Sequence, residues 1–94
     1  MLEKMKQLME MQKKMQEIKR QLDQAHFEIS SSDGLVKITM NGAQEVQDVV
    51  IQQADKASLE KAIKEAYNRA IKRAQELAAQ KMKDITGFNL PGLF

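Results

Sequence analysis

The fold depends on one alternating stretch near the middle of the chain, Leu35-Val36-Lys37-Ile38-Thr39-Met40-Asn41-Gly42. Val36, Ile38 and Met40 occupy every second position, which predicts a β-strand with one apolar face. The Asn41-Gly42 pair that follows is the strongest short hairpin signal, because a type I′ turn needs a positive φ at both central residues. The stretch therefore predicts a strand that ends in a tight two-residue hairpin.

One more strand is predicted on each side of this stretch. Phe27 and Ile29 come before a polar turn at residues 30–34, and together they indicate a short strand. After the hairpin, residues 46–51 supply the return strand. Since Val49, Val50 and Ile51 are consecutive, either both faces of that strand are covered or a bulge interrupts it. We therefore predict a three-stranded antiparallel sheet within residues 26–52.

A long amphipathic helix is predicted for residues 1–25, which contain no Gly or Pro. Apolar side chains recur there at alternating spacings of three and four, the a/d pattern of a heptad repeat. This seam consists of Leu8, Met11, Met15, Ile18, Leu22 and Ala25. Several seam positions hold Met, which is typical of adaptable packing.

A second long helix is predicted over residues 56–86. Asp55 is the expected N-cap, with Ser58 as a competing candidate, and Gly87 is a natural helix stop. A broad apolar face rich in Ala runs along it, and the many Ala residues favour close approach by a neighbouring element. The last residues, 87–94, form an uncharged apolar tail that is either a loose end or, as we favour, docks on the sheet or on a partner subunit.

These elements make an α+β fold that we expect to form a single domain over residues 1–94: long N-terminal helix, three-stranded antiparallel sheet, long C-terminal helix, apolar tail. Two helices of this length extend beyond a sheet of three short strands, and the edges of so small a sheet need cover. We therefore expect a homodimer, in which a second copy enlarges the core.

The composition excludes several kinds of site. Among its 94 residues the chain has no Cys and one His, which removes disulfides, thiol catalysts and multi-histidine metal sites. His26 lies at a helix-to-strand junction, where a structural role is commoner than catalysis, and no glycine-rich phosphate loop is present. We predict no enzyme activity, no cofactor and no metal. No apolar run is long enough for a membrane, and no signal peptide is visible, so we expect a cytoplasmic protein.

The net charge of +2 hides an uneven distribution. Residues 1–24 carry +2, residues 25–55 carry −4 and residues 56–85 carry +4. From the residues alone, the basic positions on the helices have two open interpretations: they bind nucleic-acid phosphates, or they belong to a solvated face crossed by ion pairs. The possible pairs are Glu3–Lys6, Glu10–Lys13, Glu10–Lys14, Glu17–Arg20, Glu60–Lys64 and Glu65–Arg69.

Three motifs occur in a fixed order along the chain. They are the Met-, Gln- and Lys-rich first helix, the hairpin at residues 36–42 followed by Glu45-Val46 and Val49-Val50-Ile51, and the tail Gly87-Phe88-Asn89-Leu90-Pro91-Gly92-Leu93-Phe94. This combination resembles the YbaB/EbfC family of bacterial nucleoid-associated proteins. It covers essentially the whole chain.

This resemblance implies a homodimer whose helices project from a shared β core like tweezers. It implies binding to duplex DNA with little or modest sequence preference, a role in nucleoid organisation and gene regulation, a nucleoid location, and neither catalysis nor a cofactor. Basic residues on the projecting helices are the contacts it implies: Lys6, Lys13, Lys14, Lys19 and Arg20 on the first helix, and Lys61, Lys64, Lys72 and Arg73 on the second.

A different class of function competes with DNA binding. In this alternative the chain is a protein-interaction module, its heptad helices recruit a helical partner such as a repair or replication protein, and its charges serve solubility. Binding to a membrane surface is disfavoured, because Glu residues are interleaved with the basic ones on the first helix.

Overall fold

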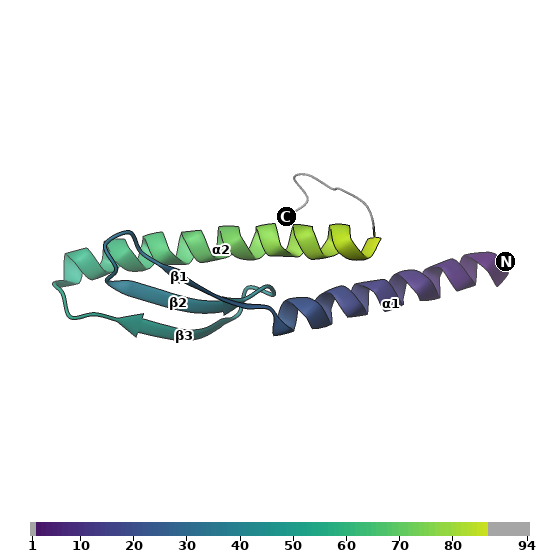
Figure 1. Ribbon diagram of the computed structural model, residues 1–94, viewed down its shortest axis with the longest axis horizontal. Coiled ribbons are helices and arrows are strands. Elements are labelled where there is room, and N and C mark those ends of the chain that lie inside the picture. Colours follow the sequence, from purple (N-terminus) through teal and green to yellow (C-terminus); the bar gives the residue numbers. More distant parts are fainter. Residues whose placement is uncertain (1, 87–94) are drawn as a thin grey trace.

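A computed structural model describes residues 2–86 of the chain. Its elements follow the predicted order (Figure 1): α1 (Leu2–Gln24), β1 (His26–Ser30), β2 (Val36–Asn41), β3 (Val46–Ile51) and α2 (Lys56–Thr86). The α+β class is confirmed, and both helices have nearly the predicted bounds. The predicted stop at Gly87 and the apolar tail lie outside the described residues.

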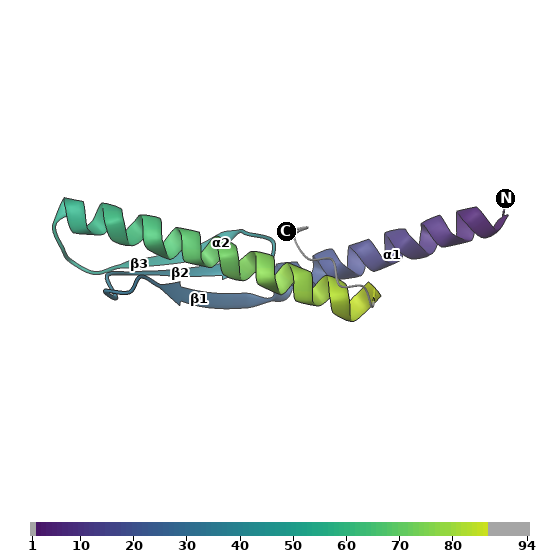
Figure 2. The ribbon, with the colours of Figure 1, turned by 90° about the horizontal axis from the view of Figure 1, so that it is seen from above.

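The three strands form one antiparallel sheet in the order β1-β2-β3, so β2 is its central strand. Ile38 of β2 lies opposite Ile29 of β1 on one side and Val49 of β3 on the other, which makes an apolar row across one face. Helix α2 covers this face, packing on β2 and to a smaller extent on β1 (Figure 1, Figure 2). The result is a two-layer structure in which β3 lies outside the strip that α2 covers.

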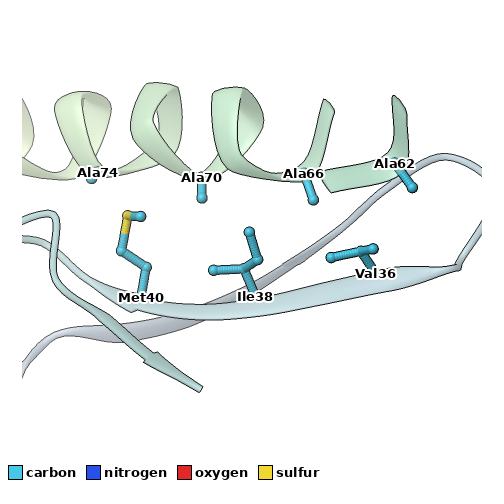
Figure 3. Packing of buried hydrophobic residues seen from close by; sticks show 7 residues of the cluster. All are labelled: Val36, Ile38, Met40, Ala62, Ala66, Ala70 and Ala74. Atoms are coloured by element: carbon cyan, nitrogen blue, oxygen red, sulfur yellow. The ribbon is translucent and has the colours of Figure 1, made fainter. Parts of the chain in front are cut away.

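Alanine residues form the contact between α2 and the sheet. Ala62, Ala66, Ala70 and Ala74 occur every four residues and are buried, and they face the side chains of β2 (Figure 3). Residues four apart lie on one side of a helix, and a methyl side chain allows the backbone to approach the sheet closely. The larger apolar side chains therefore come from β2, where Val36, Ile38 and Met40 are at most 3% exposed.

The start of α2 confirms Asp55 as the N-cap. Its Oδ2 accepts a hydrogen bond from the backbone N–H of Ser58 at 3.0 Å, and its Oδ1 accepts one from the Ser58 hydroxyl at 2.6 Å. These hydrogen bonds from Ser58 hold the pKa of Asp55 below its ordinary value. Ser58 is thus the partner of the cap inside the first turn, and the prediction that it competes for the role was wrong.

The predicted type I′ turn at Asn41-Gly42 was also wrong. Residues 42–45 connect β2 to β3, and the positive φ in this connection, 65°, belongs to Gln44. The Asn41 side-chain oxygen closes the loop instead, since it accepts hydrogen bonds from the N–H groups of Ala43 and Glu45, both at 3.0 Å. A longer loop therefore replaces the tight turn, and Asn41 serves it through its side chain.

Gly42 is required by a close approach to α1. A Cβ at this position would lie 2.7 Å from Cδ2 of Leu22 and 3.2 Å from the Leu22 carbonyl oxygen. Its N–H donates to the carbonyl oxygens of Leu22 and Ala25, both at 3.0 Å. The Gly that suggests a local turn in the sequence thus holds the end of the first helix against the hairpin.

Of the two alternatives for β3, a bulge is present, and it lies before the apolar run Val49-Val50-Ile51. The register steps from Thr39 opposite Asp48 to Met40 opposite Val46, so Gln47 is an extra residue in β3. The extra residue brings Val46 onto the same face as Val49 and Ile51, because side chains otherwise alternate along a strand. This face is the one that α2 covers over β2, yet on β3 all three side chains are 45–49% exposed.

Candidate nucleic-acid interface

Helix α1 extends away from the rest of the fold. Among its described residues only Ile18 is buried, and residues 2–16 are exposed throughout. Both views show the N-terminal part of α1 reaching beyond the end of α2 (Figure 1, Figure 2). The principal extents of 63, 23 and 17 Å reflect this projection. We call residues 2–16 the arm.

The arm takes its direction from the C-terminal end of α1. Ile18 packs there, Gly42 donates its N–H to Leu22 and Ala25, and the Asn41 side-chain amide donates to the backbone oxygen of Asp23 at 3.3 Å. Because these contacts join the last turns of α1 to the hairpin, they orient the helix that carries the basic residues.

The predicted basic residues of α1 lie on two kinds of surface. Lys6, Lys13 and Arg20 are seven residues apart, and at about 100° per residue they lie roughly 200–240° around the helix from the buried Ile18. They therefore form a stripe on the side of α1 opposite its buried seam. Lys14 and Lys19 lie nearer the apolar seam, roughly 40° and 100° from Ile18 on opposite sides.

One predicted ion pair forms on α1. Arg20 donates to Glu17 through Nε at 3.0 Å and through Nη2, and hydrogen bonds from Arg20 and then Gln21 lower the pKa of Glu17 to about 2. Within residues 2–86, no ion pair involves the four lysines of the predicted site on this helix, Lys6, Lys13, Lys14 and Lys19. Most of the basic residues predicted on α1 are therefore not held in an ion pair.

The predicted basic residues of α2 lie on its outer surface. Lys61, Lys64 and Lys72 point away from the buried alanines and have no ion pair in the part of the chain that the structure describes. Arg73 pairs with Glu76 at 3.6 Å. Of the two pairs predicted on this helix, Glu65–Arg69 forms at 3.8 Å, whereas Glu60 lies 3.9 Å from Lys56 and leaves Lys64 unpaired.

The nine predicted residues do not converge on one surface of a single chain. The stripe on α1 lies opposite its buried seam, while Lys61, Lys64 and Lys72 are exposed on α2. Lys61 lies on the same side of α2 as Glu65 and Arg69, next to the turn after β1. One chain thus presents two separate basic surfaces, and only the surface on α1 lies on a projecting element.

Sequence reasoning missed the roles of Glu65 and Arg69. The Arg69 guanidinium donates to the carbonyl oxygen of Ser30 at 3.1 Å, and the Glu65 carboxylate accepts from the N–H and, at 3.0 Å, the hydroxyl of Ser32. These hydrogen bonds, from the N–H first and then the hydroxyl, lower the pKa of Glu65. The pair fastens α2 to β1 and the turn after it. Its partners lie more than thirty residues away, so no local pattern could have indicated it.

Other kinds of site find little support in the described residues. No group of three or more His, Cys, Asp or Glu side chains within residues 2–86 could hold a metal ion. The ring of His26 makes a hydrogen bond through Nδ1 with the side-chain oxygen of Gln47, across β1 and β3. Neither α1 nor α2 is both long and apolar enough to cross a membrane. The arrangement is instead suited to binding a polyanion through separated lysines.

Comparison with known proteins agrees with the resemblance found in the sequence. Residues 1–89 match the profile of the YbaB/EbfC DNA-binding family. A nucleoid-associated protein of Clostridium novyi is 35% identical in an alignment that covers 96% of this chain and 84% of the relative. One from Caldanaerobacter subterraneus subsp. tengcongensis is 35% identical over 95% of this chain and 86% of its own. A third nucleoid-associated protein, from Caldicellulosiruptor bescii, is 32% identical in an alignment that covers 77% of this chain and 68% of the relative.

Proposed function

The chain belongs to the YbaB/EbfC DNA-binding family, and we propose that it is a nucleoid-associated protein that binds duplex DNA as a homodimer. The observation that carries this proposal is the arm, an exposed helix whose lysines lack acidic partners, in a chain whose family is defined by DNA binding. The proposed location is the nucleoid, where the protein contributes to DNA organisation and gene regulation.

Phosphate contacts account for most of the proposed binding. Lys6 and Lys13 are separated by about 10 Å along the helix axis, so both can reach phosphates on one side of a duplex. The surface of α1 offers no aromatic side chain for stacking on bases, and lysine contacts with phosphates carry no sequence information. We therefore expect salt-sensitive binding with little sequence preference.

The surface around β3 supports the homodimer. Val46, Val49 and Ile51 on β3, together with Ile63 and Tyr67 on α2, are each 42–49% exposed; we call these five residues the β3 surface. Ile63 and Tyr67 lie roughly 160° around α2 from Glu65 and Arg69. Because Glu65 and Arg69 bind the end of β1 and the turn after it, Ile63 and Tyr67 lie on the side of β3. In addition, β3 is an edge strand. A second copy related by a two-fold axis would cover both the apolar side chains and the edge.

In such a dimer two arms project from one core. The first helix carries six basic and four acidic residues in residues 1–24, and the second carries eight basic and four acidic residues in residues 56–85. Two copies of each would surround a duplex with separated basic surfaces. The two basic surfaces are separate within one chain, but the dimer would bring surfaces from both chains to one duplex. This is the tweezer-like geometry that we propose.

A gel-shift series across a salt gradient tests the DNA-binding surface. We expect Lys13→Gln/Lys14→Gln to weaken duplex binding about tenfold or more at low salt, and to reduce the slope of log affinity against log salt by roughly one for each phosphate that the variant no longer binds. The matched control is Lys37→Gln/Lys56→Gln, which changes the net charge equally but lies on the sheet and at the start of α2. Equal weakening by both variants would contradict a site on the arm, and unchanged circular dichroism shows that the fold is retained.

Sedimentation equilibrium tests the dimer. Val49 lies on the β3 surface, whereas its neighbour Val50 lies opposite Lys37 on the other face of the sheet and is 39% exposed. We expect Val49→Lys to reduce the mass from two chains to one, and Val50→Lys to leave it unchanged. A dimer that survives Val49→Lys would show that the β3 surface is not the interface.

A further inference from the structure

The apolar seam of α1 continues into the arm without any cover. Leu8, Met11 and Met15 lie within roughly 80° of Ile18 around the helix, yet they are 62%, 64% and 52% exposed. In the same seam, Ile18 is buried, and α1 packs on α2 and β2. The seam therefore leaves the fold with its repeat intact, and its outer half has no partner among the described residues.

The borders of the exposed seam carry positive charge and no negative charge. In the heptad frame with Leu8 and Met15 at position a, positions e and g of the two heptads that begin at Leu8 hold Gln12, Lys14, Lys19 and Gln21. The acidic residues Glu3, Glu10 and Glu17 all fall at position c, away from the seam. A shallow hollow on the line of the seam, lined by Lys4, Gln7, Leu8 and Met11, contains a further lysine at position d.

This distribution of charge selects among helical partners. Side chains at e and g meet those of the partner helix across a coiled-coil seam and decide which partner binds. A second copy of α1 packed in parallel would bring Lys14 of one helix against Lys19 of the other, which is unfavourable. A helix with carboxylates along both borders of its apolar stripe would instead meet Lys14 and Lys19 with opposite charge. The methionines of the seam can adapt to the side chains of such a partner.

We propose that the seam of the arm, Leu8, Met11 and Met15 bordered by Lys14 and Lys19, is a docking site for an amphipathic helix of another protein whose apolar stripe is bordered by acidic residues. The bound helix would cover the seam between Leu8 and Met15 and extend toward Lys19. It leaves the outer stripe of Lys6, Lys13 and Arg20 uncovered, because that stripe faces the opposite side of α1. The inference goes beyond DNA binding and does not depend on it.

Two synthetic peptides test the proposal directly. Both are 21-residue helices with Leu at a and d, one with Glu and the other with Lys at every e and g position. Fluorescence anisotropy with the full-length protein at low salt should show binding of the Glu peptide and none of the Lys peptide at the same concentration. Equal binding of both peptides, or no binding of the Glu peptide, would overturn the proposal.

Variants then locate the site. Met11→Ser/Met15→Ser should weaken binding of the Glu peptide by at least about tenfold, since each side chain would otherwise be buried in the complex. Met9→Ser is the matched control, because Met9 is 57% exposed on the same helix but lies roughly opposite Ile18. Lys14→Glu/Lys19→Glu should exchange the preference, so that the Lys peptide binds and the Glu peptide does not. A loss with Met9→Ser as large as that with the seam variant, or an unchanged preference after charge reversal, would also overturn it.

The same variants distinguish the other possible occupants of the seam. If Met11→Ser/Met15→Ser lowers the mass of the protein in sedimentation equilibrium, the seam binds a second copy and the proposal is wrong. If the Glu peptide binds only after removal of residues 87–94, the tail of the chain is the natural occupant, and the proposal is equally wrong. Duplex binding of the methionine variant should stay unchanged, because all the lysines remain, so failure of this inference is separable from failure of the proposed function.

Discussion

The two helices have similar sequence patterns and very different surroundings. Both α1, with 23 residues, and α2, with 31, carry apolar residues at helical spacing. Helix α2 buries an alanine every four residues from Ala62 to Ala78, whereas α1 buries only Ile18 among its described residues. A stripe of methyl groups fits closely against a strand of larger side chains, but a seam of methionines extends outward and meets no such surface within residues 2–86. Apolar residues at helical spacing thus show that a helix has a face for packing. The size of those residues indicates which kind of surface that face can pack against.

The largest expected effect comes from the strand beneath α2. Met40 is completely buried against the alanine stripe, so we expect Met40→Ala to lower the free energy of unfolding by about 3 kcal/mol through reduced apolar burial and a cavity. Urea denaturation at one fixed protein concentration measures this, because the stability of a dimer depends on concentration. A loss below about 1 kcal/mol would mean that α2 closes over the cavity, and that its fit to the sheet is looser than the alanine stripe indicates.

A smaller effect is expected where α1 joins the hairpin. Gly42→Ala would place a methyl group 2.7 Å from Cδ2 of Leu22, which we expect to cost about 1–2 kcal/mol of unfolding free energy through overpacking. The cause is a lack of space, since Gly42 is not among the residues with a positive φ.

A double-mutant cycle with Leu22→Ala separates the two sources of this crowding. If the Leu22 side chain is the main obstacle, Gly42→Ala costs less in the Leu22→Ala background than in the native one. An equal cost in both backgrounds would identify the backbone of α1 as the obstacle, which would make the orientation of the arm harder to change.

Sequence reasoning succeeded for features that depend on neighbouring residues. The period of two at Val36, Ile38 and Met40 predicted β2 and its buried face, the unbroken repeat in residues 1–25 predicted α1, and Asp55 predicted the start of α2. The consecutive apolar residues of β3 left a bulge as one of two possibilities; the register shows one at Gln47, whereas the run itself alternates regularly and leaves Val50 39% exposed on the other face. Each of these signals is contained within a few residues of the structure it describes.

It failed where one residue serves a distant partner. Gly42 looked like half of a tight turn because the sequence does not show that Leu22 lies against it. The candidate site shows the same limit. The positions of the nine basic residues on their helices followed from the helical period, but their division between two separate surfaces depends on how α1 and α2 pack, and only Glu17–Arg20 formed among the ion pairs predicted on α1.

Acid should affect the attachment of α2 by a still smaller amount. The folded pKa of Glu65 lies below its ordinary value of 4.5, because Ser32 donates hydrogen bonds to the carboxylate. Its stabilisation is therefore complete above about pH 4.5 and is lost as the pH falls through the folded pKa. We expect Glu65→Gln to lower the melting temperature at pH 7, with a difference from the native protein that shrinks near pH 3. A difference that is constant with pH would show that the carboxylate charge does not contribute.

The smallest expected effect is for a methionine of the exposed arm, which is changed to alanine in the same way as the buried Met40. Met15→Ala removes the same atoms as Met40→Ala, but Met15 is 52% exposed and Ala favours the helix, so the free energy of unfolding should change by less than about 0.5 kcal/mol. The same urea titration at the same protein concentration makes the two methionines directly comparable. A cost above about 1 kcal/mol would show that the seam is covered in the protein in solution, since an exposed side chain has little burial to lose. In that case both helices would have a covered apolar face. The face of α2 is covered by the sheet, and the seam of the arm would be part of an interface.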